Sequence, residues 1–233
     1  MSTAVQRIVR DSATESMRLD NGDRMTQAEF HRRYLAYPED VKFELVEGVV
    51  YMASPLRRDH GKYHVQLGIL LELYESETPG VEVLDNVTTI LGEESEPQPD
   101  LALRVLSAYG GRSRETDDDY IEGPPELIAE VAYSTRSIDM HQKRRDYERA
   151  GVREYLVLCV EEAALHWFRF KPRVELVADK RAVYRSRVFP GLWLDSAAIF
   201  ARDRAQAVKT LRDGLASPEH AAFVRKLQAR EKA

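Results

Sequence analysis

The alternation of hydrophobic and polar positions along the chain predicts a series of short strands separated by turn residues. Two of these strands, in KFELVE and VVYMAS, lie on either side of Gly48 and predict a hairpin. Two more apolar segments follow Gly151 closely and predict a second antiparallel pair. The later pair is REYLVLCV with ALHWFRF, and the remaining predicted strands lie in VEVLDNVTTIL, PDLALRV and ELIAEVA.

Helices are predicted where apolar residues recur every three or four positions. Thr26 and Glu29 have the spacing of a capping box, which predicts the start of a helix that Pro38 ends. The other predicted helices cover residues 58–75, residues 138–150 with Gly151 as the stop, and residues 202–230 with an interruption at Ser217-Pro218.

The order of these elements predicts the fold class. Strands alternate with helices over residues 25–200, which indicates an α/β domain. Residues 1–24 are polar and without periodicity, and we expect them to form an N-terminal arm. Residues 201–233 are expected to form a helical C-terminal extension.

Composition excludes several classes of protein. With 43% hydrophobic and 31% charged residues, the 233-residue chain is unlike a disordered tail, a collagen repeat or a disulfide scaffold. No apolar run approaches the ~20 residues that span a bilayer, so no membrane association is expected. Cys159 is the only cysteine and predicts neither a disulfide nor a thiolate zinc site, so a cytoplasmic location is expected.

Charge is unevenly distributed, although the formal net charge is −5. Residues 136–153 hold six basic and three acidic side chains. A chain that is acidic overall has no general attraction for nucleic acid, so any contact with DNA has to use such a local basic set.

Two carboxylates stand at unusual positions in the predicted strands. Glu130 interrupts the otherwise apolar strand LIAEVA (127–132), and such a strand is typically buried within a sheet. A buried carboxylate needs a cation or hydrogen-bond donors, so the alternatives are a salt-bridged core glutamate and a functional group. Asp100 follows Pro99 and begins a strand whose apolar residues alternate with it, which is also compatible with an ordinary strand start.

Lys143 and Glu44 complete a chemically coherent set with these two acids. At about 100° per residue, Lys143 lies on the same helix face as Met140 and Tyr147, which is the apolar face. The alternative is a surface pair between Lys143 and Asp139. Few carboxylates, with water and phosphate oxygens, suit a hard cation such as Mg²⁺, and a lysine beside them can orient the attacking water.

At these residues the chain resembles a known family. The blocks FELVEG (43–48), ASPLRRDH (53–60), QPD (98–100), ELIAEVAYST (126–135) and KRRDYERAGVREYLV (143–157) are similar to the Uma-type family of the PD-(D/E)XK nuclease superfamily. The resemblance covers about residues 25–200. It implies a restriction-endonuclease-like core, in which a central mixed sheet is flanked by helices.

The resemblance also implies a function, namely a Mg²⁺-dependent DNA endonuclease, with Mn²⁺ as a possible substitute. Asp100 and Glu130 correspond to the metal ligands and Glu44 to an accessory acid. The usual lysine stands two residues after the glutamate, where this chain has Ala132, so Lys143 from the next helix takes its place. The alternative function is a non-catalytic binding or assembly protein on a nuclease-like scaffold, which Ala132 and the net charge of −5 favour.

Further side chains are weaker candidates. His60 and His64 are four residues apart on a predicted helix, a spacing compatible with metal binding, but the sequence indicates no third ligand. His60 also matches the family's histidine, which implies a phosphate-binding or active-site role. A homodimer is a possible assembly. The residues expected to contact DNA phosphates are Arg57, Arg58, Lys62, Arg144 and Arg145.

Overall fold

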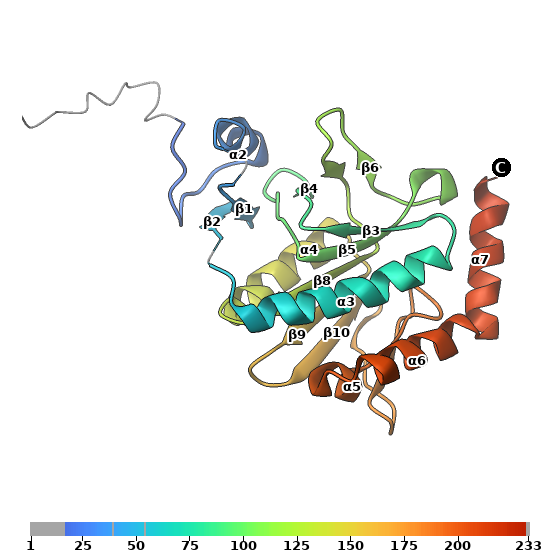
Figure 1. The fold of residues 1–233 in the computed structure, drawn as a ribbon. Coiled ribbons are helices and arrows are strands. Elements are labelled where there is room, and N and C mark those ends of the chain that lie inside the picture. The colour runs from blue at the N-terminus through green and yellow to red at the C-terminus, as the bar shows by residue number, and fades with distance from the viewer. Residues whose placement is uncertain (1–16, 39, 54, 232–233) are drawn as a thin grey trace, which may run out of the picture.

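A six-stranded mixed sheet forms the centre of the computed structural model, which describes residues 17–38, 40–53 and 55–231 (Figure 1). Only β8 and β9 run parallel, and the other neighbouring strands are antiparallel. In spatial order the strands are β11 (Arg173–Glu175), β10 (Ala164–Phe170), β9 (Glu154–Cys159), β8 (Leu127–Ala132), β5 (Leu101–Val105) and β3 (Val81–Asp85). The predicted α/β class with a mixed sheet is confirmed.

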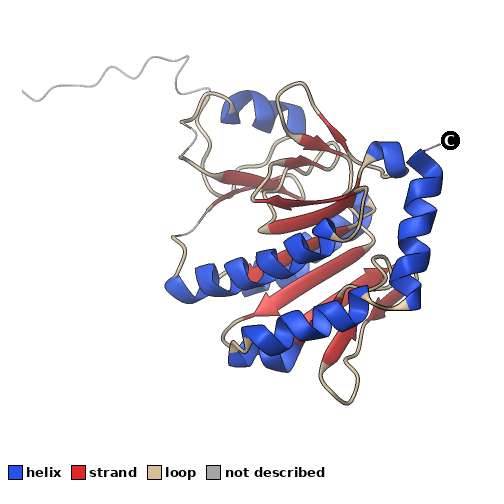
Figure 2. Ribbon diagram, turned by 45° about the vertical axis from the view of Figure 1, so that its right-hand side comes forward, coloured by secondary structure: helices blue, strands red, loops and turns tan. Residues whose placement is uncertain are grey.

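Helices cover both faces of this sheet (Figure 2). Side chains alternate between the faces of a strand, so Leu127, Ala129 and Val131 of β8 belong to one apolar core. Ile128 and Ala132 belong to the core on the opposite face. The first core is covered by α3 (Arg58–Ser76), α5 (Ser196–Ala201) and α6 (Arg204–Leu215), and the second by α4 (Arg144–Ala150).

Three small sheets surround the central one. The hairpin predicted around Gly48 is present, and both Glu47 and Gly48 have positive φ, as the turn of such a hairpin requires. The small sheets are β1 (Phe43–Val46) with β2 (Val49–Met52), β12 (Val183–Arg185) with β13 (Trp193–Asp195), and β4 (Thr89–Ile90) with β7 (Ile121–Glu122) and β6 (Arg114–Glu115).

The N-terminal segment packs against the β1–β2 hairpin from a residue earlier in the chain than the sequence predicts. Thr26 caps α2 (Gln27–Tyr34) by accepting the Glu29 N–H, which confirms the predicted helix start. The Glu29 carboxylate accepts from Arg32 and Arg33, so the second bond of a capping box is not formed. Residues 1–16 of the predicted arm lie outside the described residues. In the remainder of the arm, Leu19 is buried in the small core that includes Phe30 and Phe43. Residues from Leu19 onward are therefore packed against the domain.

The helix predicted over residues 138–150 is present but begins with an unexpected geometry. Its first part, η2 (Ile138–Lys143), is a π-helix, and regular α-helical geometry begins at Arg144. The hydroxyl of Tyr155 donates to the carbonyl oxygen of Asp139 at 3.1 Å, which gives this turn a hydrogen-bond donor from outside the helix. Gly151 ends the helix in the left-handed region, as predicted.

The long acidic segment between β5 and β8 is more structured than its sequence predicts. It contains η1 (Ser107–Tyr109) and the β6–β7 hairpin, and β7 pairs in parallel with β4. Arg104, which is buried in β5, forms an ion pair with Glu115 of this segment. The pairing with β4 and the ion pair with Arg104 involve residues outside the segment, so no local pattern could have predicted them.

The two C-terminal helices are α6 and α7 (Pro218–Glu231), separated at Ser217-Pro218 as predicted. Ala207 and Leu211 of α6 and Leu227 of α7 belong to the same core as α3 and the sheet. The described part of the predicted extension therefore completes the main core.

Replacing Leu211 by alanine is expected to lower the free energy of unfolding by about 2–5 kcal/mol, because a fully buried leucine leaves a cavity. The exposed neighbour Arg212 is the control, and Arg212→Ala should change stability by less than about 0.5 kcal/mol. Urea denaturation measures both values. Equal, small losses for the two variants would show that α6 is an appendage.

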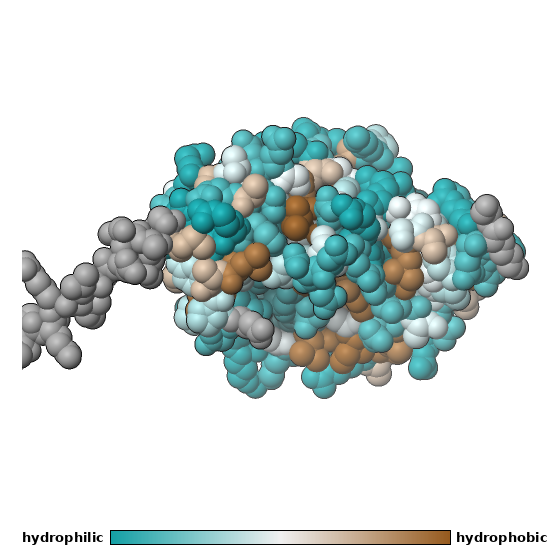
Figure 3. All heavy atoms as spheres, turned by 90° about the horizontal axis from the view of Figure 1, so that it is seen from above, coloured by the Kyte–Doolittle hydropathy of each residue, from teal (hydrophilic) through white to brown (hydrophobic). Residues whose placement is uncertain are grey.

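The surface is mainly hydrophilic on the face shown in Figure 3, where apolar residues form small separate groups. Of the helices in the described part of the chain, none combines the length and the apolar character needed to span a bilayer.

Candidate active site

A cavity of about 690 Å³ lies at the end of the central sheet where β5 begins and β8 ends. The sequence candidates Glu44, Asp100, Glu130 and Lys143 all line it. They come from β1, the residue before β5, β8 and η2, so the folded chain brings four separate segments together. The other charged side chains and histidines in its wall are Asp40, Lys42, Arg57, His60 and Asp139.

Strand register explains why Asp100 and Glu130 meet. Leu101 of β5 pairs with Ala129 of the antiparallel β8, so Asp100, one residue before β5, comes beside Glu130. The Asp100 N–H donates to Glu130 Oε2 at 3.3 Å, and the Val131 N–H donates to Asp100 Oδ2 at 2.7 Å. The backbone of the sheet thereby holds both carboxylates at one place.

Lys143 links the acids from the helix side. Its Nζ donates to Glu44 Oε1 at 2.9 Å and to Glu130 Oε1 at 3.0 Å, and only 7% of its side chain is exposed. Glu44 Oε1 also accepts the N–H of Gln98 at 2.8 Å. Ala132, where the usual lysine would stand, is buried in the apolar core under α4. An ammonium group therefore reaches Glu130 without a lysine at position 132.

Two further side chains of the site were missed by the sequence reasoning. Asp139 is buried, and its Oδ1 lies 3.9 Å from Lys143 Nζ. The hydroxyl of Tyr147 donates to Glu130 Oε1 at 2.9 Å. Asp139, Lys143 and Tyr147 are each four residues apart, and this spacing is the signal that would have placed all three on one face.

Within the site, carboxylates outnumber basic groups. Burial and the neighbouring acids raise the pKa of Glu130 well above its ordinary value, despite the opposing effect of Lys143. Burial likewise raises the pKa of Asp139 to about 6. Burial alone would lower the pKa of Lys143, but the carboxylates of Glu130, Glu44 and Asp139 raise it well above its ordinary value. The lysine is therefore held in its charged form.

Asp100 behaves differently from the other buried acids. Burial favours its neutral form, but the hydrogen bond and charge of His60, the N–H of Val131 and the charge of Lys143 together lower its pKa. Asp100 therefore stays ionised more readily than Glu130 or Asp139. An ionised carboxylate at a cavity wall is suited to binding a cation.

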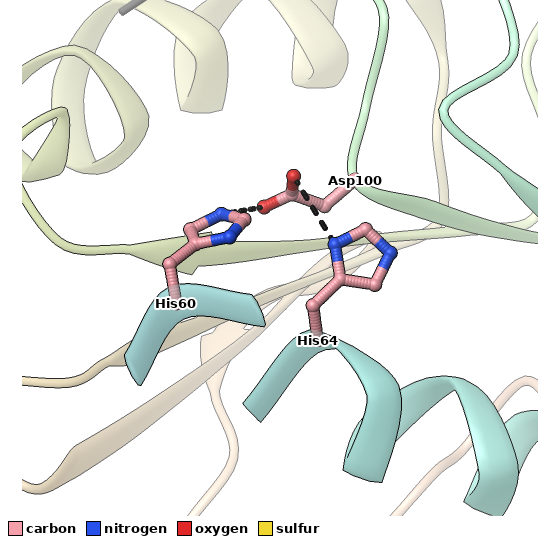
Figure 4. A group of neighbouring side chains, drawn as sticks. All are labelled: His60, His64 and Asp100. Atoms are coloured by element: carbon pink, nitrogen blue, oxygen red, sulfur yellow. Dashed lines mark hydrogen bonds and ion pairs between the residues drawn. The ribbon is translucent and has the colours of Figure 1, made fainter. Parts of the chain in front are cut away.

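Two histidines of α3 face the Asp100 carboxylate, as Figure 4 shows. His60 Nε2 lies 3.2 Å from Asp100 Oδ2, and His64 Nδ1 lies 3.7 Å from Asp100 Oδ1. The other ring nitrogen of His64 lies 2.6 Å from a carboxylate oxygen of Asp85. The potential ligand atoms of His60, His64 and Asp100 all lie within 4.8 Å of one another. Folding thus places Asp100, a predicted metal ligand, beside the two histidines as a third potential ligand.

The candidate DNA-contacting residues do not all reach the cavity. Arg57 lines it, with its guanidinium 4.9 Å from the ring centre of Tyr133. Arg145 forms an ion pair with Glu47, and Arg144 lies over the ring of Phe168. Arg58 and Lys62 lie on α3, outside the cavity wall.

Comparison with known proteins identifies the family. The sequence model of the Uma2 family, described as "Putative restriction endonuclease", matches residues 28–197, more than half of the chain. The chain belongs to the Uma2 family. The match contains Glu44, Asp100, Glu130 and Lys143 and ends within α5. Among curated proteins, none matches the chain.

A solved structure has the same fold as this Uma2 chain. It is a crystal structure from Anabaena variabilis ATCC 29413, described as "a putative nuclease belonging to DUF820". The TM-score is 0.60 at 15% sequence identity, and the similarity covers 76% of this chain and 98% of that one. The predicted restriction-endonuclease-like core with a central mixed sheet is thus confirmed at the level of the fold.

Proposed function

We propose that this Uma2 chain is a metal-dependent DNA endonuclease that hydrolyses phosphodiester bonds. The observation that carries the proposal is the convergence of three acids in one cavity, where Glu44 and Glu130 bind the ammonium of Lys143 and Asp100 lies beside Glu130. Membership of a family described as restriction endonucleases supports the same reaction class.

The donor set fits a hard divalent cation. Four carboxylates, including that of Asp139, line the cavity near Lys143. Burial raises the pKa of Glu130 and of Asp139, and the neighbouring acids raise both further. Asp100 and Glu130 would hold Mg²⁺, or Mn²⁺ in its place. When bound, the ion neutralises phosphate charge and lowers the pKa of its water.

The chain's own side chains then have separate roles. Lys143 would orient the attacking water and stabilise the negative charge that develops on the phosphate. Glu44 shares the Lys143 ammonium with Glu130 and so positions it. His60, hydrogen-bonded to Asp100, favours the ionised form of that ligand.

Basic side chains in the cavity wall are positioned to contact the phosphates of DNA. Lys42 and Arg57 line it together with the acids, and Arg57 is exposed. We infer that these two residues contact phosphates, while Arg144 and Arg145 serve mainly in their contacts within the protein. Binding through so few phosphate contacts should be modest and should weaken as salt rises.

The function is tested with supercoiled plasmid. The wild-type protein should nick the plasmid in Mg²⁺, and a chelator should stop the reaction. Glu130→Gln should abolish nicking, whereas Glu161→Gln, an exposed glutamate between β9 and β10, should leave it unchanged. If the protein binds neither Mg²⁺ nor Mn²⁺ by calorimetry and leaves the plasmid intact, it is a scaffold on a nuclease fold and the proposal is wrong.

A further inference from the structure

A second cavity, of about 500 Å³, lies at the opposite end of the central sheet. Glu126, just before β8, and Arg153, just before β9, line it together with Val105 at the end of β5. Because β8 and β9 run from this end toward Glu130, the cavity is separated from the candidate active site by most of a strand length, about 15 Å. Helix α7 stands beside this end of the sheet (Figure 1).

The wall of this cavity is strongly basic. Five of its cations have no carboxylate within 4 Å among the described residues: Arg153, Arg169, Lys171, Arg187 and Lys226. Arginines elsewhere, such as Arg145 and Arg173, form ion pairs with nearby glutamates. These five cations lie together in one cavity on a protein whose formal net charge is −5.

Two more arginines line the same cavity. Arg112 lies 3.5 Å from Glu126, which is the only acidic side chain in the wall. Arg230 of α7 reaches over Gly110, where a Cβ atom would come within 2.8 Å of its guanidinium. Gly110 also has a positive φ, so the absence of a side chain there allows both the turn and the close approach of Arg230.

The nearby acids are engaged in other contacts and do not neutralise these cations. Glu126 Oε2 accepts the N–H of Val105 at 2.8 Å. The carboxylate of Glu154 lies next to Arg153 in sequence but accepts hydrogen bonds from Trp167, Ser186 and the N–H groups of Arg187 and Val188. Seven basic residues against one acid therefore leave the cavity with a large positive excess.

The chemistry of the wall indicates what fits the cavity. Guanidinium and ammonium groups bind phosphate oxygens strongly, and several convergent cations suit an anion with several charges. Val188, Pro190 and Phe223 add an apolar portion to the same wall. A volume of about 500 Å³ lies in the range of small-molecule sites.

We propose that this basic cavity binds a small phosphate-bearing ligand of the nucleoside polyphosphate class. The cations hold the phosphates, and the apolar side contacts the nucleoside. The site is separate from the Asp100–Glu130 cavity, so its occupancy does not depend on the proposed nuclease reaction.

The test is calorimetry with tripolyphosphate and with ATP, in the absence of divalent metal and at physiological salt. Both probes should bind the full-length protein, and ATP should bind more tightly because the apolar wall contacts its nucleoside. Equal affinity for the two probes would overturn the assignment to a nucleoside polyphosphate. Arg153→Glu and Lys226→Glu should each weaken binding by about tenfold or more. The matched control is Arg225→Glu, which makes the same charge change on the exposed neighbour of Lys226 outside the cavity wall.

The outcomes separate this site from the active site. Asp100→Asn should leave tripolyphosphate binding unchanged, since that residue belongs to the other cavity. Melting temperatures of all variants establish that they are folded. Equal loss of binding in the Arg225 and Lys226 variants, or no binding of either probe, would overturn the proposal. Binding of duplex DNA at these residues without binding of either small probe would also overturn it, in favour of a DNA-contacting surface.

Discussion

Replacing Lys143 by methionine is expected to reduce plasmid cleavage by at least about a hundredfold, which corresponds to roughly 3 kcal/mol of transition-state stabilisation. Methionine keeps most of the apolar stem but removes the ammonium that contacts Glu44 and Glu130. Without metal, the variant should also unfold more readily, by about 3–5 kcal/mol, since removing one member of a buried ion pair leaves the other without compensation. Metal binding should survive because the acids remain.

Nicking assays, urea denaturation and metal titration measure these three effects separately. Lys209→Met is the matched control, because Lys209 is an exposed lysine of α6 paired with Asp213. Lys143→Arg retains the charge, so it should lose less stability than the methionine variant. Undiminished nicking by a folded Lys143→Met protein would show that this lysine has no part in the reaction.

Asp100→Asn is expected to remove most of the stabilisation that Mg²⁺ or Mn²⁺ gives to the protein. A ligand at a hundred times its Kd stabilises the folded state by about 2.7 kcal/mol, which raises the melting temperature by about 5–10 °C for a chain of this size. Asparagine retains an oxygen for the N–H of Val131 but lacks the charge that holds a cation. The variant should therefore melt near the metal-free wild type whether or not metal is added.

Thermal melts with and without metal check this expectation. Asp40→Asn provides the control, because Asp40 is an exposed acid in the wall of the same cavity. A metal-induced shift that persists in Asp100→Asn and disappears in Asp40→Asn would place the ion at the rim of the cavity. Asp100 would then have no role as a ligand.

Local sequence patterns predicted the helix and strand boundaries correctly where hydrogen bonds within a few residues determine them. The helix start at Thr26 and the stop at Gly151 were confirmed because each depends on hydrogen bonds within a few residues. The apolar run around Glu130 correctly predicted a strand buried within the sheet. The π-helical turn at Ile138–Lys143 was not predictable, since one of its contacts comes from Tyr155 on another element.

The candidate residues of the site were identifiable as chemical types but not as a geometry. The sequence indicated Glu130 and Lys143 as candidates because each places a charged group among apolar residues, Glu130 in a strand and Lys143 on a helix face. The role of Asp139 as a buried neighbour of Lys143 was missed, because the same spacing also describes a surface pair and only burial distinguishes the two. His64 likewise lacked a third partner until α3 was placed against the start of β5.

By itself, the sequence determined the main strands and helices, the inward face on which Lys143 stands, and the resemblance to the nuclease family. These follow from periodicities and motifs that act over a few residues. Only the tertiary structure decided that Asp100 meets Glu130 across 30 residues and that Lys143 meets Glu44 across 99. It also decided that the basic residues around Arg153 and Lys226 enclose one cavity. These contacts between distant residues depend on strand register and on helix packing. Both are determined by burial of the complete hydrophobic core, which no local sequence pattern specifies.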